Sequence, residues 1–234
     1  MSAIQPALDR LEFPVYARFF AAMHDAMRRD ALRLVDAVDT TNDLAALARW
    51  FDRFESVIEH HHHCEDEIVW PGLEAIVARG QCGVEGTAFL DARLTLLDDH
   101  EQLDVAMSAV RGALSGASST GTRLDCARRF QEGLDEHLTR EEAALFPLLC
   151  RHVGEDEFLE LEDAVGRSTP FKALTFTVPW VIDGAPTDIA QDIASQLPLP
   201  IRIVNRWVLQ PRYRRLVEAA TGQPTGEQTG EQGS

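Results

Sequence analysis

The chain has 234 residues, 45% of them hydrophobic, which is enough for one domain of roughly 150 residues and an appended segment. Its formal net charge of −16 argues against nucleic acid or an anionic membrane as the main partner. No stretch reaches the roughly 20 apolar residues that span a bilayer, the first residues carry no export signal, and the four cysteines lack disulfide-rich or Cys-x2-Cys spacing. These features predict a cytoplasmic protein.

Four long helices are predicted in the first two thirds of the chain. Apolar residues recur at helical spacing in each, with Leu90, Leu94 and Leu97 in the stripe of the third. Pro14 suits the first turn of the first helix, whereas Pro71 should kink or end the regular part of the second. The predicted helices span residues 11–39, 43–79, 84–114 and 124–152.

The short connections between these helices predict an all-α fold, an up-down-up-down four-helix bundle. A short helix over residues 155–165 completes a first domain of residues 1–167. All of the net charge lies in this domain, because residues 168–234 carry six basic and six acidic side chains.

The chain changes character after residue 168, where Gly and Pro become denser and irregular structure is expected. A C-terminal helical extension is predicted over residues 168–220, with helices over 188–197 and 201–217, the second broken near Pro211. The tail, residues 221–234, is rich in Thr, Gly, Gln and Glu and is predicted to be disordered.

Residues 201–217 form an amphipathic segment, apolar on one side and basic on the other. Two roles fit this pattern: docking on a membrane or a partner, or packing back on the acidic bundle. The complementary charge favours packing on the bundle, with Trp180 and Trp207 buried there. Such a cover would restrict solvent access to the bundle or form a dimer contact.

The pattern His-x36-His-x3-Glu-x5-Pro occurs twice, and the two copies are offset by 76 residues. Residues i and i+4 lie nearly above one another on a helix, so each copy presents an imidazole and a carboxylate to one neighbour. These residue types are metal ligands, and the repeat predicts a two-metal centre with internal pseudo-symmetry, one helical hairpin per copy. The copies are His24, His61, Glu65 and Pro71, and then His100, His137, Glu141 and Pro147.

The repeat selects one ligand from the four successive histidines at positions 60–63. Only His61 maps onto another histidine, whereas its three neighbours map onto a glutamate, a leucine and a threonine. We therefore expect those three, His62 among them, to be partly exposed, or at most to support the ligands. Cys64 is expected to be a small packed side chain rather than a thiolate ligand, because its counterpart is an arginine.

These motifs together resemble the hemerythrin-like domain of the HHE cation-binding type, over about residues 11–152. The resemblance implies a non-haem di-iron centre, oxo- or hydroxo-bridged, inside the bundle. It implies that His24 and His61 bind one iron, that His100 and His137 bind the other, and that Glu65 and Glu141 bridge the two. The motifs that carry it are His24-Asp25, His61-x3-Glu65-x4-Trp-Pro, His100-Glu101 and His137-x3-Glu141-Glu142-x3-Phe-Pro.

The chain departs from the oxygen-carrying hemerythrins on the third helix. The carriers have two histidines four residues apart there, and the second of these positions is Asp104 in this chain. The final carboxylate also follows its histidine by four residues instead of five. Asp104 is either a third carboxylate ligand or an ordinary solvated acid. More oxygen ligands and fewer histidines favour ferric iron, and therefore turnover or sensing over reversible O2 carriage.

The resemblance and the ligand set predict a small-molecule partner: O2, H2O2 or nitric oxide. The leading function is the handling of O2 or H2O2, with peroxide decomposition in oxidative-stress defence as the enzyme activity and no catalytic residue beyond the metal centre. Two alternatives stay open: a non-enzymatic module that binds or senses O2, iron or nitric oxide, and a structural bundle whose histidines bind no metal. A homo-oligomer also stays open. Replacing His61 or His137 by alanine should release iron, whereas His62→Ala should retain it.

Overall fold

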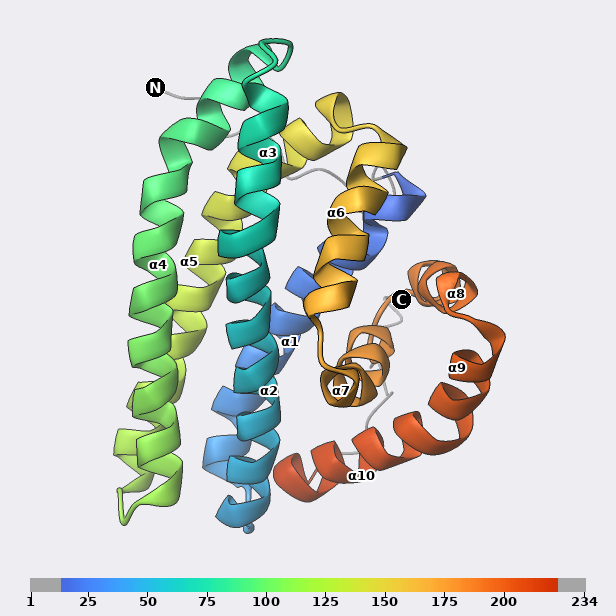
Figure 1. The fold of residues 1–234 in the computed structure, drawn as a ribbon. Coiled ribbons are helices and arrows are strands. Elements are labelled where there is room, and N and C mark those ends of the chain that lie inside the picture. The colour runs from blue at the N-terminus through green and yellow to red at the C-terminus, as the bar shows by residue number, and fades with distance from the viewer. Residues whose placement is uncertain (1–13, 223–234) are drawn as a thin grey trace, which may run out of the picture.

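The computed structural model describes residues 14–222, and all the regular structure in this range is helical (Figure 1). The predicted all-α fold is therefore confirmed. Four long helices, the second of them extended by α3, form the bundle. They are α1 (Arg18–Thr40), α2 (Leu44–Cys64) with α3 (Trp70–Val77), α4 (Gly83–Ser115) and α5 (Thr120–His152).

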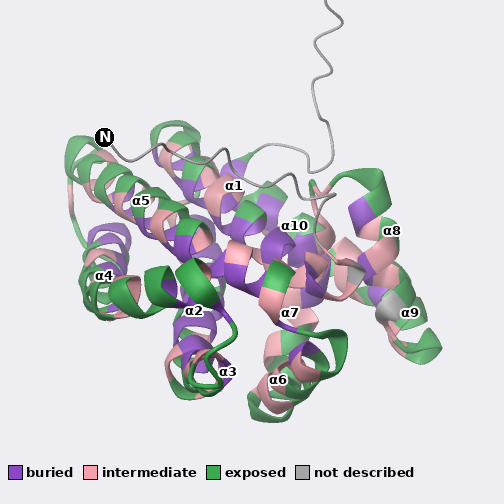
Figure 2. Ribbon diagram, turned by 90° about the horizontal axis from the view of Figure 1, so that it is seen from above, coloured by how far each residue is buried: buried purple, intermediate pink, exposed green. Residues whose placement is uncertain are grey.

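Each long helix of the bundle packs on two others. α4 lies along α5, α5 lies along α1, and α2 packs on both α4 and α1. Connections of a few residues join α1 to α2 and α4 to α5, so each of these pairs forms a helical hairpin. The buried faces of the four helices meet in a common interior (Figure 2).

Polar side chains cap the N-termini of two of these helices. The Asp43 carboxylate accepts a hydrogen bond from the Ala46 backbone N–H at 2.8 Å, at the start of α2. The Ser119 hydroxyl accepts one from the Thr122 backbone N–H at 3.1 Å, at the start of α5. Each bond satisfies an N–H group that the first helical turn would otherwise leave free, so the local sequence sets where each helix begins.

The second predicted helix continues past Pro71, but one turn of it is widened. A π-helical segment, Glu65–Val69, joins α2 to α3, and the Trp70 backbone N–H donates to the Glu65 carbonyl. Proline lacks an N–H and clashes with the carbonyl four residues before it, and the wider turn before Pro71 accommodates its ring. The regular part of the helix therefore ends at Cys64.

Two details of the predicted bundle are wrong. Leu90 and Leu94, predicted to lie in the apolar stripe of the third helix, are 45% and 71% exposed. The buried face of α4 contains Phe89 and Leu96 instead, so the stripe is turned by about one residue around the helix. α1 begins at Arg18, after a 3-10 turn, and not at residue 11; residues 11–13 lie outside the described range.

The segment after residue 168 is helical as far as residue 221, which corrects the expectation of irregular structure. Pro170, Pro186 and Pro198 each occupy the N-cap of a helix, where no intrahelical N–H bond is needed. These prolines therefore begin helices instead of interrupting them. The predicted disordered tail lies outside the described residues from 223 onward. The helices that follow the bundle are α6 (Glu155–Ser168), α7 (Phe171–Ile182), α8 (Thr187–Gln196), α9 (Leu199–Val204) and, after a π-helical turn (Asn205–Leu209), α10 (Gln210–Thr221).

α7 and α10 pack on the bundle and extend its core. Trp180 of α7 and Tyr213 of α10 are buried in the same hydrophobic cluster as Phe54 of α2. Trp207, predicted to be buried here as well, is 71% exposed, because the π-helical turn buries Asn205 and directs the indole outward. Within residues 14–222, no helix combines the length and the apolar character needed to cross a membrane.

A buried carboxylate links the bundle to this extension. Asp30 of α1 accepts a hydrogen bond from the Trp180 indole N–H at 2.9 Å. Its other oxygen pairs with Arg29 at 2.9 Å and with Arg33 at 2.6 Å. Arg33 also pairs with Asp183, at the end of α7, at 3.2 Å. We call these five residues the Asp30 cluster.

Candidate metal centre

A buried cluster of histidines and glutamates lies between the four long helices. Its possible ligand atoms form two groups, in each of which the atoms lie within 4.8 Å of one another. Glu65 belongs to both groups, and no member is more than 6% exposed. The first group is His24, His61, Glu65 and Glu141, and the second is His62, Glu65, His100 and His137. We call these seven residues the His/Glu cluster.

The distances in the cluster repeat with the 76-residue offset of the sequence. His24 Nε2 lies 3.7 Å from a Glu141 oxygen, and its counterpart His100 Nε2 lies 3.6 Å from a Glu65 oxygen. Within the hairpins, His61 Nε2 is 2.9 Å from Glu65 and His137 Nε2 is 3.4 Å from Glu141. Each glutamate therefore reaches a histidine of its own hairpin and a histidine of the other.

Further carboxylates fix the orientation of two histidine rings. A Glu142 oxygen lies 3.1 Å from His24 Nδ1, and its counterpart Asp66 lies 3.1 Å from His100 Nδ1. A carboxylate at Nδ1 holds the proton on that nitrogen, which leaves Nε2 free as an electron-pair donor toward the cluster. The sequence reasoning missed both carboxylates, although an acidic residue directly follows each repeated glutamate.

His62 is the residue that the repeat placed wrongly. It is 4% exposed, and its ring stacks on that of His100 with the centroids 4.0 Å apart. Neighbouring residues on a helix point about 100° apart, so His61 faces His24 on α1 while His62 faces α4. The counterpart of His62 in the second hairpin is Leu138, which is also buried. Its apolar character was the signal in the sequence that this position faces the interior.

The other residues singled out in the sequence lie outside the cluster. His63 is exposed and His60 is partly exposed, as predicted. Asp104 is exposed on α4 and belongs to neither group of possible ligands that the described residues form. Cys64 is buried, and its sulfur lies 3.5 Å from both the His60 ring and the Ser168 hydroxyl.

Burial controls the protonation of the cluster. It lowers the pKa of His61 to about 3 and the pKa of His62 well below its ordinary value, and it raises the pKa of Glu65 to about 7. At His100, burial would lower the pKa, but the bond to Asp66 and the charge of Glu65 outweigh it and raise the pKa. The interior thus favours the neutral forms of most of these groups. A bound cation would instead favour the charged carboxylate form of the glutamates.

Aromatic rings cover the cluster beside His24. The Phe20 ring lies 5.0 Å from the His24 ring and 5.7 Å from the His61 ring, measured between centroids. The Phe146 ring lies 5.5 Å from the His24 ring. Apolar walls of this kind exclude water and strengthen electrostatic interactions inside the site.

Comparison with known proteins agrees with this geometry. The family model of the hemerythrin HHE cation binding domain matches residues 16–149, more than half of the chain. The chain belongs to the hemerythrin family. All seven residues of the His/Glu cluster lie within the matched range of the hemerythrin domain, whereas α6 to α10 lie beyond it. No curated protein and no solved structure matched the chain.

The hemerythrin domain contains buried polar atoms that fit a bound cation. Both oxygens of Glu65 and of Glu141 lack a hydrogen-bond partner, and so does the Nε2 atom of each of the five histidines in the cluster. The 2.9 Å approach of His61 to Glu65 lacks hydrogen-bond geometry. Buried polar atoms without partners are rare, because each costs about 1–3 kcal/mol. Imidazole nitrogens and carboxylate oxygens are ligands for iron, manganese and zinc, so the donor set fits a metal.

Proposed function

We propose that this hemerythrin domain is a non-haem di-iron protein that handles O2 or H2O2. Cation binding is the property of its family, and the His/Glu cluster offers the ligands for it. The observation that carries the proposal is that so many buried nitrogen and oxygen atoms without hydrogen-bond partners belong to this one cluster. Their number and their two groups support two ions rather than one.

The proposed ligands divide between the two irons. The grouping rests on the 4.8 Å limit within each group and on the position of both glutamates between the hairpins. Asp104 is left out, because its side chain is exposed. The proposed sets are His24 and His61 for one iron, His62, His100 and His137 for the other, and Glu65 and Glu141 shared by both.

The chain's own residues would orient these ligands and keep water away. Asp66 and Glu142 hold the rings of His100 and His24 by their Nδ1 atoms, so that each Nε2 faces the cluster. Phe20 covers the two histidines of the first group. A pair of irons supplies two linked one-electron changes, which match the two electrons exchanged when H2O2 is reduced or oxidised. We propose peroxide decomposition as the leading activity on this basis.

The ligand balance favours a second candidate function. The sequence-based argument for a ferric centre rested on about four histidines and two or three carboxylates, with Asp104 as the possible third. With His62 in the set, five histidines and two glutamates surround the proposed centre. That balance is nearer to the oxygen carriers, which have a histidine at the position of Asp104. Binding or sensing of O2 or nitric oxide without turnover is therefore the alternative.

We also propose a cytoplasmic setting. All four cysteines are free, including Cys82, which is buried. A reducing compartment keeps thiols in this state.

Metal analysis of protein produced in iron-replete medium tests the di-iron proposal first. We expect about two irons per chain and the absorption of an oxo- or hydroxo-bridged ferric pair, because the donor set suits iron. Less than about one iron per chain without such absorption would contradict the proposal, since one ion cannot occupy both groups.

Reaction with O2 and peroxide then separates the two functions. The protein is reduced anaerobically, its spectrum is recorded, and O2 or H2O2 is added. Consumption of H2O2 faster than by free iron supports peroxide decomposition. A spectral change that reverses when O2 is removed, with no peroxide consumed, supports the binding module instead.

A further inference from the structure

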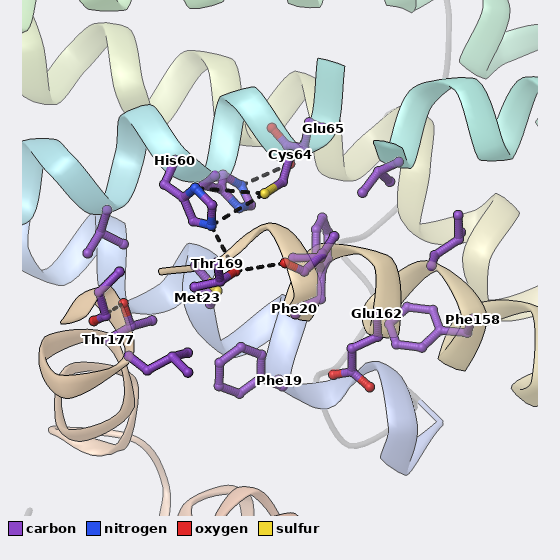
Figure 3. Close-up of a pocket in the computed structure, with 18 of the residues that line it drawn as sticks. Phe19, Phe20, Met23, His60, Cys64, Glu65, Phe158, Glu162, Thr169 and Thr177 are labelled. Atoms are coloured by element: carbon purple, nitrogen blue, oxygen red, sulfur yellow. Dashed lines mark hydrogen bonds and ion pairs between the residues drawn. The ribbon is translucent and has the colours of Figure 1, made fainter. Parts of the chain in front are cut away.

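A chamber lies beside the His/Glu cluster, between the bundle and the helices that follow it. Its volume is about 270 Å³. α1 and α2 form one wall and α6 and α7 form the other, so that the chamber spans the hemerythrin domain and the segment beyond it (Figure 3). We call it the α6–α7 chamber.

Apolar side chains form most of the lining of the chamber on both walls. Phe19, Phe20 and Met23 come from α1, and Phe158 and Leu161 come from α6. Figure 3 shows the Phe19, Phe20 and Phe158 side chains around the open space. An apolar cavity of about 150 Å³ in another protein is enough to bind benzene. The α6–α7 chamber therefore has room for an organic molecule larger than benzene, far more than a diatomic gas needs.

The outer wall of the chamber packs on the bundle. A Cβ atom on Gly72 would lie 2.3 Å from Leu161 Cδ2, so a side chain at position 72 would displace the Leu161 side chain of α6. α7 is joined to α1 by the hydrogen bond between Trp180 and Asp30. The chamber is thus a built part of the fold.

The charges around the chamber favour a neutral occupant. None of the described residues that line it is Lys or Arg, and its acidic members are Glu65 and Glu162. Burial raises the pKa of Glu162, which favours the neutral acid. A polar pair in the lining is already bonded to itself, with His60 Nε2 2.8 Å from the Thr169 hydroxyl. An anionic group would find no Lys or Arg among the described lining residues to offset its desolvation.

The chamber and the His/Glu cluster share side chains. His61 and Glu65 belong to the cluster and also line the chamber. Phe20 lines the chamber, and its ring contacts those of His24 and His61. A molecule in the chamber would therefore lie beside the cluster, next to Phe20 and His61.

We propose that the α6–α7 chamber binds one neutral, mainly apolar organic molecule, with one end against Phe20 and the edge of His61. A mainly apolar enclosure with a few polar groups is the usual form of a small-molecule site. The binding of this molecule is independent of the proposed function. Its role as a substrate or effector of the metal centre rests on that function.

A pair of fluorescent probes with the same ring system tests this proposal on the iron-loaded full chain. N-phenyl-1-naphthylamine is neutral, and 8-anilinonaphthalene-1-sulfonate is the same skeleton with an anionic group. We expect saturable binding of the neutral probe at one site per chain, and binding of the anionic probe weaker by about tenfold or more, because no Lys or Arg lines the chamber to pair with its sulfonate. Equal binding of the two probes would overturn the proposal.

Two substitutions that reduce the chamber locate the site. Ala173→Phe on α7 and Val165→Phe on α6 each place a ring where the wall is lined by a smaller side chain. Each should weaken binding of the neutral probe by about tenfold or more while the iron content stays unchanged, because the added ring takes the space of the ligand. The control is Lys172→Phe, which adds the same ring at an exposed position of α7.

Two outcomes decide the location of the site. Unchanged probe binding in whichever of the two filled variants retains its helical circular dichroism would overturn the proposal, and so would equal loss in Lys172→Phe. Selectivity between the probes is measured on the unmodified chain and needs no variant. Chamber binding by a chain that holds no iron would support this inference and contradict only the proposed function.

Discussion

Two groups of buried polar side chains each include residues of α1, and they differ in whether their atoms have hydrogen-bond partners. In the Asp30 cluster, each Asp30 oxygen is bonded, one to Trp180 and the other to Arg29 and Arg33. In the His/Glu cluster, six residues further back along the helix at His24, the glutamate oxygens and the histidine Nε2 atoms have no hydrogen-bond partners.

This difference distinguishes a structural link from a binding site. A buried carboxylate with all its hydrogen-bond partners stabilises the packing of two elements. Buried metal ligands without partners instead destabilise the metal-free fold, and a bound cation would offset that cost. The Asp30 cluster joins the bundle to α7 and should act on stability. The His/Glu cluster should act on metal content and contribute little stability without metal. Substitutions in each cluster test whether stability and metal content respond separately.

The largest expected effect is that of Glu65→Ala. Glu65 belongs to both groups of possible ligands, so its loss should reduce iron from about two per chain to almost none. Elemental analysis of the purified variant gives the result. Without metal, the variant should be at least as stable as the unmodified chain, since it loses a partnerless buried carboxyl. Its control is Glu67→Ala, an exposed acid in the same π-helical turn, and equal iron loss there would refute the assignment.

His62→Ala should remove one of the two irons. His62 belongs only to the group with His100 and His137, and both its ring nitrogens lack partners, so the first group stays complete. We expect about one iron per chain and loss of the absorption of the bridged pair. This reverses the expectation from the repeat. His63→Ala, one residue away and exposed, should keep both irons; the idea fails if the two variants retain the same amount.

Asp30→Ala should destabilise the chain and leave the iron in place. Removing one partner of a buried ion pair costs about 3–5 kcal/mol, because the mostly buried Arg29 loses its carboxylate, although Arg33 keeps Asp183. Denaturant unfolding, followed by circular dichroism, measures this loss, and elemental analysis of the folded variant should still find about two irons. Asp36→Ala changes an exposed acid of the same helix and should have almost no effect. Iron loss in Asp30→Ala without destabilisation would show that the Asp30 cluster acts on metal binding and not on stability.

The smallest expected effect is that of Asp66→Asn. An amide at this position binds His100 Nδ1 less strongly than the carboxylate does, so the ring would be held less firmly. We expect metal affinity to fall by about 10–100-fold, measured by competition with a chelator. Asp98→Asn, on an exposed acid of α4, is the matched change. An unchanged affinity in Asp66→Asn would show that this carboxylate does not position the ring.

The repeat in the sequence determined the pairing of the hairpins and six residues of the His/Glu cluster. Helical periodicity and short connections were enough for the all-α fold, because both depend on local geometry alone. The 76-residue offset singled out His61 in a run of four histidines, and the structure places it in the cluster with its counterpart His137.

Only the tertiary structure decided the rest. Whether His62 faces solvent or α4 depends on where the neighbouring helix lies, and two adjacent residues can both be buried when helices flank α2 on two sides. The same holds for Asp104, which the packing of α4 leaves exposed, and for Trp207, which a π-helical turn directs outward. The chamber could not be predicted at all, because one of its walls comes from α6 and α7, helices that the repeat does not include.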